Sequence, residues 1–504
     1  MTNPLYDTLF GKYSDAKTTF IKTTDGKIIT HGGFMAMAAR LANALTNLGL
    51  TKGDRVAVQV EKSVESICVY AACAQAGLVF LPLNTAYTAN EVSYFVEDSG
   101  AKVFICDGCK EDALKPIAHR AGAKLETLNE DGSGSLVELA KMQANTFQTV
   151  ETSGDDLAAF LYTSGTTGRS KGAMLTQNNL LSNAITLSGY WQFTDKDILL
   201  HALPIFHTHG LFVAINVSLV SGASMIMMPK FDAKTVLDNI PNATALMGVP
   251  TFYTRLLSEP GFDKELVKTM RLFISGSAPL LAETHVEFEQ RTGHRILERY
   301  GMTETNMNTS NPYTGDRRAG TVGYPLPGVE VKITRPETGE ELEAGEIGML
   351  EVRGPNVFKG YWNMPEKTKE ELRSNGYFIT GDLGVIDKEG YVQIIGRDKD
   401  LIISGGFNIY PKEIELLLDD QKGVIESAVI GVPHPDFGET PLGILVCHPS
   451  QESDIFKIEK QIAKELARFK HPRKLIVVDE LPRNTMGKVQ KNLLREEYKN
   501  MFVV

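Results

Sequence analysis

Residues 162–172 read YTSGTTGRSKG, and they follow directly after the apolar run LAAFL at 157–161. The stretch contains three glycines, several hydroxyl side chains, one arginine and one lysine, so it cannot build a hydrophobic core. Its glycines allow the backbone to turn tightly and to approach a ligand closely. Backbone N–H groups and hydroxyls that face outward beside Arg169 and Lys171 are typical of a phosphate-binding loop.

The surroundings of this loop predict a strand at 158–164 before it and a helix at 178–190 after it. The P-loop pattern G-x-x-x-x-G-K-[ST] does not fit, because two residues separate Gly168 from Lys171. A flexible surface loop is the alternative. Because glycine and threonine are packed so densely between two core elements, we favour a loop that holds phosphate.

The first half of the chain alternates between helical and strand-like hydrophobic patterns, which indicates an α/β fold with doubly wound, mainly parallel sheets. The predicted helices are 33–50, 64–77 and 91–100, and the predicted strands are 55–60, 79–84 and 101–106. A second run of short apolar stretches, each closed by glycine or proline, lies at 198–204, 223–229, 243–250, 270–277 and 295–301.

The pattern changes from about Thr321, where short alternating strands at 329–362 indicate an antiparallel β subdomain. The last hundred residues predict helices at 411–420 and 453–468 and strands at 425–433, 442–449 and 474–482. We therefore expect a large N-terminal domain, residues 1–398, that includes the β subdomain. A small, mobile C-terminal α+β domain would comprise residues 399–504, with the boundary inside the charged and glycine-rich stretch 396–406.

Composition excludes several classes of partner. A chain of 504 residues exceeds what one hydrophobic core supports, and its formal net charge of −10 makes nucleic acid or an anionic membrane surface an unsuitable main partner. The longest apolar tract, 211–228, is interrupted by polar residues and glycine and predicts a helix, a turn and a buried strand rather than a membrane span. The N-terminus lacks the pattern of a signal peptide, so we expect a cytoplasmic location.

The five cysteines do not form a disulfide framework. Cys106 and Cys109 make a single C-x-x-C, which leaves a zinc or redox site open as an alternative. No second pair follows, so we favour two ordinary thiols at the edge of a strand.

Four further motifs follow the loop: RYGMTE at 299–304, TGD at 380–382, GRDKDLIISGGFNIYPKEIE at 396–415 and PRNTMGKVQK at 482–491. In this order the chain resembles, over essentially its whole length, the adenylate-forming superfamily of acyl-CoA synthetases, luciferases and adenylation domains of peptide synthetases. The resemblance implies that ATP activates a carboxylate as an acyl-adenylate with release of pyrophosphate, and that a thiol then displaces AMP. It implies ATP and Mg²⁺ as cofactors and coenzyme A as co-substrate.

The resemblance also assigns roles to individual residues. It places Tyr300 against adenine, Thr303 on the α-phosphate, and Glu304 together with Thr163 at Mg²⁺. The β- and γ-phosphates would be held by residues of the loop, namely Thr163, Ser164, Gly165, Thr166, Thr167 and Lys171. Taken singly, Tyr300 would fit a core aromatic residue and Glu304 a charge at a helix N-terminus, but neither alternative explains the whole motif.

The motifs near the C-terminus complete these assignments by resemblance. Asp382 and Arg397 would bind the ribose, and Lys488 would reach the α-phosphate and the substrate carboxylate during adenylation. Lys399 stands where the family has its hinge, and rotation there would bring Gly405 and Gly406 to the pantetheine arm of coenzyme A. The alternatives are a turn-forming role for Asp382 and a solvated lysine at 488. Acylation of Lys488 as a form of regulation is a further hypothesis.

The acyl pocket is expected at 207–210, 248–255, 275–280 and the residues after Glu304. These segments supply a small polar set with one permanent cation: His207, Thr208, Arg255, Ser277 and Met307. Arg255 lies at helical spacing from Thr251, and a guanidinium binds a carboxylate with two parallel hydrogen bonds. If Arg255 points into the pocket, the substrate carries a second carboxylate, as malonate does. A surface salt bridge on the helix is the alternative.

Three segments, at 248–257, 271–281 and 298–313, look much like malonyl-CoA synthetases. The sequence therefore predicts a malonate–CoA ligase that also accepts methylmalonate, with another short acid (acetate, propionate or succinate) as the alternative substrate. A domain that loads a carrier protein is disfavoured because no carrier segment is attached. A catalytically silent AMP sensor on the same fold is disfavoured because Lys171, Glu304 and Lys488 are all present. Oligomeric state is not predicted.

Overall fold

The computed structural model describes residues 2–163, 170–336, 338–404, 407–448, 455–485 and 487–502. The chain divides into two compact units: unit 1 comprises Met1–Glu330 and Val352–Phe378, and unit 2 comprises Val331–Glu351 and Ile379–Val504. The expected α/β class, with a large N-terminal part and a small C-terminal part, is confirmed. The boundary expected at 398/399 concerns a hinge that this division does not test, so it stays a prediction.

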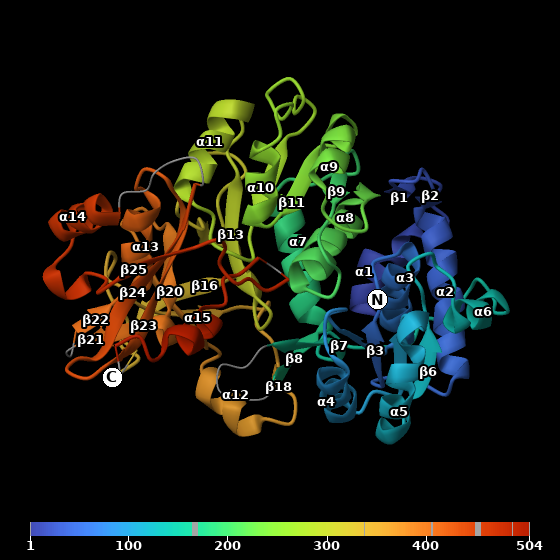
Figure 1. Ribbon diagram of the computed structural model, residues 1–504. Coiled ribbons are helices and arrows are strands. Elements are labelled where there is room, and N and C mark those ends of the chain that lie inside the picture. Colours follow the sequence, from blue (N-terminus) through green and yellow to red (C-terminus); the bar gives the residue numbers. More distant parts are fainter. Residues whose placement is uncertain are drawn as a thin grey trace. The chain divides into compact units, whose positions relative to one another are not determined.

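The first sheet of unit 1 has seven strands, which Figure 1 shows in blue to green with strand β18 in orange. Its central strands β4, β3, β5, β6 and β7 pair in parallel, whereas β8 pairs antiparallel with both β7 and β18. In spatial order the strands are β18 (Gly360–Tyr361), β8 (Lys171–Thr176), β7 (Leu157–Thr163), β4 (Val79–Pro82), β3 (Arg55–Gln59), β5 (Val103–Cys106) and β6 (Lys124–Thr127).

The second sheet of unit 1 has nine strands and is also parallel at its centre. In spatial order they are β15 (Tyr324–Pro325), β14 (Asn306–Ser310), β13 (Leu297–Met302), β12 (Leu272–Ser275), β11 (Ala245–Gly248), β9 (Ile198–His201), β10 (Ser224–Met227), β1 (Thr19–Thr23) and β2 (Ile28–Thr30). The helices of unit 1 are α1 (Pro4–Leu9), α2 (His31–Asn47), α3 (Val64–Ala76), α4 (Ala89–Ser99), α5 (Glu111–Ala121), α6 (Ser135–Lys141), α7 (Gln177–Tyr190), α8 (Asn216–Ser221), α9 (Ala233–Asn239), α10 (Pro250–Leu257), α11 (Ala282–Thr292) and α12 (Pro365–Glu371).

Most predicted elements of unit 1 are confirmed, including the helix expected at 178–190, but the strand between the glycine-rich loop and that helix was not predicted. Residues 171–176 form β8, which pairs antiparallel with β7, and α7 begins only at Gln177. In the sequence, the loop residues therefore stand between two antiparallel strands rather than directly before a helix. The short segment KGAMLT lacks the β-branched alternation that marks a strand, and its pairing with β7 decides its conformation.

The apolar tract at 211–228 has the structure that its interruptions predict. A π-helix at His209–Ile215 continues into α8, Gly222 ends that helix with a positive φ of 76°, and β10 follows. None of the described helices is long and apolar enough to cross a membrane.

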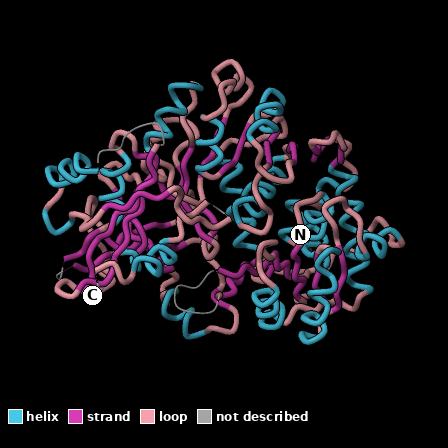
Figure 2. The backbone as a smooth tube through the Cα atoms, in the orientation of Figure 1, coloured by secondary structure: helices cyan, strands magenta, loops and turns pink. Residues whose placement is uncertain are grey.

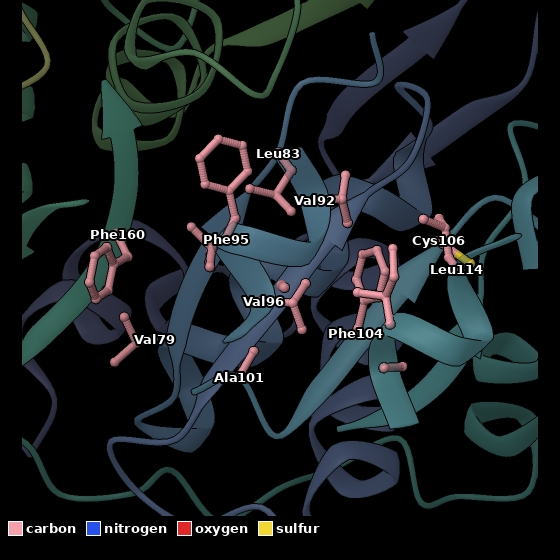
Figure 3. Close-up of a cluster of buried hydrophobic side chains, with 14 residues drawn as sticks. Val79, Leu83, Val92, Phe95, Val96, Ala101, Phe104, Cys106, Leu114 and Phe160 are labelled. Atoms are coloured by element: carbon pink, nitrogen blue, oxygen red, sulfur yellow. The ribbon is translucent and has the colours of Figure 1, made fainter. Parts of the chain in front are cut away.

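A buried cluster fixes α4 and α5 against the seven-stranded sheet. Figure 3 shows side chains from α4 gathered with side chains from the strands, among them Phe95, Val96, Phe104 and Phe160. The apolar residues of α4 repeat at spacings of three and four, which places them on one side of the helix. Phe160, at the middle of β7, is fully buried and lies 5.2 Å from the Trp362 ring, centroid to centroid.

Unit 2 contains two sheets, and Figure 2 shows how rich in strands this part of the chain is. The four-stranded sheet has the order β16 (Glu330–Thr334), β17 (Gly348–Arg353), β19 (Phe378–Ile386) and β20 (Val392–Arg397). The five-stranded sheet consists of β22 (Phe407–Ile409), β21 (Ile402–Ser404), β24 (Gly438–Cys447), β23 (Val424–His434) and β25 (Leu475–Val478). Its helices are α13 (Pro411–Asp419), α14 (Ile455–Glu465) and α15 (Lys491–Tyr498).

The five-stranded sheet buries both faces. Val429 and Leu445 belong to one hydrophobic cluster, whereas their neighbours Ile430 and Ile444 belong to another. Because side chains alternate along a strand, these two clusters occupy opposite faces of the sheet. The α+β character expected for the C-terminal part is thus confirmed.

Replacing Phe160 with alanine tests the central cluster of unit 1. We expect Phe160→Ala to lower the free energy of unfolding by about 3–5 kcal/mol, because it removes a fully buried ring and leaves a cavity. Urea titration followed by intrinsic fluorescence measures the change. Ile185→Ala is the control, since Ile185 of α7 is 49% exposed; equal losses in both variants would contradict the assignment of the core.

Candidate active site

A hydrogen-bonded cluster of charged side chains lies at the start of β8. The Nζ of Lys171 is 3.0 Å from both carboxylate oxygens of Glu371 and 3.1 Å from the Oη of Tyr361. The same Oη lies 2.6 Å from Glu371 Oε2 and 3.0 Å from Glu304 Oε1. The phosphate lysine and the metal carboxylate expected from the sequence are therefore joined by a tyrosine and a glutamate that the sequence did not indicate.

Thr163 and Glu304 are brought together as the sequence implied. The hydroxyl of Thr163, at the end of β7, donates to Glu304 Oε1 over 3.4 Å, and Glu304 is only 5% exposed. A buried carboxylate beside a hydroxyl supplies the oxygen ligands that Mg²⁺ prefers, so these residues fit such an ion. The other expected residues of the loop, Ser164, Gly165, Thr166 and Thr167, lie outside the described residues.

The motif at 299–304 comprises the end of β13 and the first residues of the turn that leads into the antiparallel strand β14. A Cβ at Gly301 would lie 1.9 Å from the backbone oxygen of Asn306, so only glycine permits this close turn. The turn places Tyr300, Thr303 and Glu304 within one short segment, with Tyr300 and Thr303 partly exposed and Glu304 buried. Met307 follows in β14 and is 2% exposed.

A second group of polar side chains lies at the ends of β9 and β12. The Nδ1 of His209 is 3.2 Å from the Oγ of Ser277, and His207 is partly exposed nearby in sequence. Ser277 has a φ of +73°, a left-handed conformation that is costly for a residue with a Cβ. Among the residues that the structure describes, Thr208 Oγ1 and His209 Nε2 are buried without a hydrogen-bond partner. These two atoms therefore lack the hydrogen bond that a buried polar group normally makes.

A buried cation, Arg299, lies beside this group. It is the first residue of the motif at 299–304, but no role could be assigned to it from the sequence. Arg299 is 3% exposed, and its guanidinium packs so closely on Gly276 that a Cβ there would lie 2.5 Å from Arg299 Cζ. Within the described part of the chain, its Nε and Nη2 find no hydrogen-bond partner. Burial lowers the pKa of Arg299 to about 9, so the guanidinium is still charged at neutral pH.

Arg255 is placed differently from the expectation. It lies on the exposed side of α10, whose buried residues include Phe252, Tyr253 and Leu256. Its side chain lines a surface hollow together with Phe231, Asp232, Ala233, Ser258 and Glu259. This hollow contains none of the other residues expected in the acyl pocket. The role of Arg255 as a ligand for a second carboxylate stays a prediction.

Lys62 fixes the segment that leads from β9 to the histidine motif, residues 207–210. Its Nζ donates to the backbone oxygens of His201 and Leu203 over 2.9 and 3.0 Å and lies 3.2 Å from His201 Nδ1. His201 Nε2 lies 2.8 Å from the backbone oxygen of Gly210, which can only accept, so Nε2 carries the proton and Nδ1 accepts from Lys62. Burial lowers the pKa of Lys62 to about 7, and burial together with the charge of Lys62 lowers that of His201 to about 3.

The residues expected to bind ribose form an ion pair within unit 2. Arg397 Nε lies 2.8 Å from Asp382 Oδ1, and Arg397 Nη1 donates to the backbone oxygen of Thr380. Asp382 and Arg397 are paired across β19 and β20, which explains why two residues distant in sequence meet. Lys399 follows in a 3₁₀ turn, where burial lowers its pKa.

Lys488 is exposed in a tight turn of unit 2. Its backbone N–H donates to Asn484 Oδ1, and its backbone oxygen accepts from the N–H of Asn484. Gly405 and Gly406 lie outside the described residues.

The two thiols of the C-x-x-C differ in their exposure. Cys106 is buried and Cys109 exposed, and both are free. Among the described residues, no group of three or more histidine, cysteine or acidic side chains could hold a metal ion.

Comparison with protein families gives matches over most of the chain. Residues 11–362 match the family described as AMP-binding enzyme, and residues 413–488 match the AMP-binding enzyme C-terminal domain.

Individual relatives agree with these matches. The structure of ATP-bound MatB from Rhodopseudomonas palustris is 57% identical, covers 100% of both chains and superposes with a TM-score of 0.98. A malonate–CoA ligase of Arabidopsis thaliana is 33% identical over 98% of this chain and 89% of the relative. The long-chain-fatty-acid–CoA ligase FadD13 of Mycobacterium tuberculosis is 36% identical over 93% of both. The relatives thus share the fold and differ in the acid that their names specify.

Substitution of Lys62 tests its burial through the pH dependence of stability. The folded pKa is lower than the unfolded one, so between about pH 7 and 10 the unfolded chain binds more protons, and stability rises with pH. We expect the stability of the wild type relative to Lys62→Met to rise by up to about 1.4 kcal/mol per pH unit in this range. Urea unfolding at pH 7, 8 and 9 measures it. Lys196→Met, at an exposed position, should show no such trend; a flat difference for Lys62→Met would contradict the assignment.

Proposed function

The chain belongs to the AMP-binding enzyme family, and from this premise we propose that it is a malonate–CoA ligase. The reaction converts ATP, malonate and coenzyme A into malonyl-CoA, AMP and pyrophosphate by way of a malonyl-adenylate. A free carboxylate is a poor electrophile, and transfer of AMP to it supplies a leaving group that a thiol can displace. The similarity to ATP-bound MatB supports ATP as the nucleotide, and the Arabidopsis relative supports malonate as the acid.

The observation that carries the choice of acid is the buried guanidinium of Arg299. Two of its nitrogens have no partner in the described structure, and the polar atoms of Ser277 and His209 lie on neighbouring segments. A second carboxylate on the substrate would accept two hydrogen bonds from this planar group. An acid with one carboxylate would leave the buried charge unpaired, which costs about 2–5 kcal/mol. We therefore propose that Arg299 binds the distal carboxylate, with Arg255 as the alternative.

The adenylation step uses residues of both units. Lys171 and the hydroxyls of the loop would hold the β- and γ-phosphates, Thr303 the α-phosphate, and Tyr300 the adenine. Asp382 and Arg397 would bind the ribose. Mg²⁺, when bound by Glu304 and Thr163, would neutralise charge on the phosphates. Lys488 would stabilise the negative charge that develops where the malonate oxygen attacks the α-phosphorus.

Thioester formation is the second half-reaction. We propose that the C-terminal domain rotates about Lys399, which withdraws Lys488 and brings Gly405 and Gly406 to the pantetheine arm. Domain rotation of this kind is a hinge motion. We further propose a cytoplasmic location, and methylmalonate as a second substrate.

The exposure of Lys488 supports one regulatory proposal, its acylation. An acyl group would remove the charge that the adenylation step needs. Mass spectrometry of the protein isolated from cells in active and inactive states tests this, and an unmodified Lys488 in both would remove the proposal.

The first prediction concerns the acid. With ATP and Mg²⁺, we expect malonate to release pyrophosphate faster than acetate, succinate or benzoate do. Arg299→Met should lower kcat/KM for malonate by about 30-fold or more, since a loss of 2–5 kcal/mol corresponds to that factor. Arg255→Met is the matched control and should change it less than about threefold.

Two outcomes would contradict this assignment in different ways. If Arg255→Met is the damaging variant and Arg299→Met is harmless, the distal carboxylate belongs to Arg255. If the wild type uses acetate or benzoate as well as malonate, the enzyme is a ligase for another acid.

Lys488→Met separates the two half-reactions. We expect malonate-dependent pyrophosphate release to fall by about 100- to 1000-fold, because one fixed cation is lost from the transition state. Formation of malonyl-CoA from added malonyl-adenylate and coenzyme A should stay within a few-fold of the wild type. Lys491→Met, three residues further on, serves as the control; equal loss of both half-reactions in Lys488→Met would refute the division of labour.

A further inference from the structure

Lys171 forms an ion pair with a carboxylate of the same chain, that of Glu371. Its Nζ is equidistant, at 3.0 Å, from the two carboxylate oxygens of Glu371 on α12. Both side chains are largely shielded from water, with 16% of Lys171 and 23% of Glu371 exposed. A carboxylate with two oxygens on one ammonium presents negative charge and oxygen acceptors, as a phosphate does. Glu371 thus holds the lysine in the way that the nucleotide is expected to hold it.

Lys367 also pairs with the carboxylate of Glu371, so the negative charge keeps one cationic partner if Lys171 moves to another anion. The Nζ of Lys367, one turn earlier on α12, lies 3.0 Å from Glu371 Oε1. Burial acts to raise the pKa of Glu371, but hydrogen bonds from Tyr361, Lys367 and Lys171 outweigh burial and lower it. Glu371 is therefore ionised at neutral pH in this arrangement, in which Lys171 contacts both carboxylate oxygens and Lys367 contacts Oε1.

Tyr361 links this pair to the expected metal carboxylate. Burial, followed by the charge of Glu304, raises the pKa of Tyr361, so its hydroxyl keeps its single proton. That proton can be donated to only one carboxylate at a time, and the shorter contact, 2.6 Å, is to Glu371 rather than to Glu304 at 3.0 Å. Lys171 Nζ also lies 4.2 Å from the centre of the Tyr361 ring. The partner of Lys171 and the proton of Tyr361 are therefore coupled.

We propose that Glu371 is a further residue of the nucleotide site, an internal competitor that occupies Lys171 until a phosphate group takes its place. Without nucleotide, the ion pair keeps the shielded ammonium compensated. ATP binds by exchanging one anion for another on Lys171, so its affinity is lower than the phosphate contacts alone would give. The inference rests on the proposed function only in taking Lys171 as a phosphate contact.

Equilibrium binding of ATP in the presence of Mg²⁺, without acid or coenzyme A, tests the proposal by calorimetry. Glu371→Gln keeps the shape of the side chain and removes its charge, and we expect it to tighten ATP binding about fivefold, the effect of a partly exposed ion pair. Glu370→Gln is the matched control, because Glu370 lies beside Glu371 on α12 and pairs with Lys367 but not with Lys171. We expect no more than a twofold change there.

A double-mutant cycle connects the effect to Lys171. In a Lys171→Met background, Glu371→Gln should leave ATP affinity unchanged, because the contested cation is gone. Unchanged or weaker binding in Glu371→Gln alone, an equal gain in Glu370→Gln, or a gain that persists without Lys171 would each overturn the proposal. Because no acid is present, these results do not depend on malonate being the substrate, and a failed pyrophosphate assay would leave them intact.

Discussion

Three cations lie in the interior of unit 1 where water hydrates them poorly, and the way each is compensated shapes the site. Lys62 donates hydrogen bonds to backbone oxygens, and Lys171 forms an ion pair with Glu371. Arg299 has two nitrogens without a hydrogen-bond partner among the described residues. A buried charge without a partner costs several kcal/mol, so a chain retains one only where something else offsets that cost. On our proposal an anionic substrate does so at Arg299, and this links the arrangement of the site to the charge of what it binds.

Parallel strands bring the parts of the site together. Strands β9, β11, β12 and β13 are neighbours in one sheet and run in the same direction, so their carboxyl ends lie at one edge. The histidine motif, Ser277 and the turn with Glu304 each follow one of these ends. In open α/β sheets, ligands bind at this edge because the loops there are free to carry polar groups. Lys62 reaches the same edge from the other sheet of unit 1 and fixes the segment after β9.

Elements with a clear hydrophobic period or a local motif could be predicted from the sequence. Features that depend on contacts between distant segments could not. The strands and helices around 55–106 have clear apolar periods and were predicted correctly, as was the meeting of Thr163 with Glu304 through family motifs. The strand β8 was missed because its pairing with β7, and not its own composition, makes it extended. Arg255 was predicted to point into the acyl pocket because it lies at helical spacing from Thr251. Such spacing shows which residues share a face of a helix, but it does not show which face is buried. Lys62 and Glu371 belong to no motif, and Arg299 begins the motif at 299–304 but was given no role; only the folded chain shows the burial and the contacts of these three residues.

The identity of the acid follows from side chains rather than from the fold. A relative named as a long-chain-fatty-acid ligase is 36% identical, so the same architecture accommodates an apolar chain in one protein and, on our proposal, a dianion in another. A site built to pair a buried charge rejects a substrate that lacks the matching group far more strongly than an apolar pocket rejects a substrate one methylene too short. An apolar chain laid against Arg299 would leave its guanidinium unpaired in a dry environment. On our proposal, this buried arginine is what distinguishes short diacids from fatty acids in this chain.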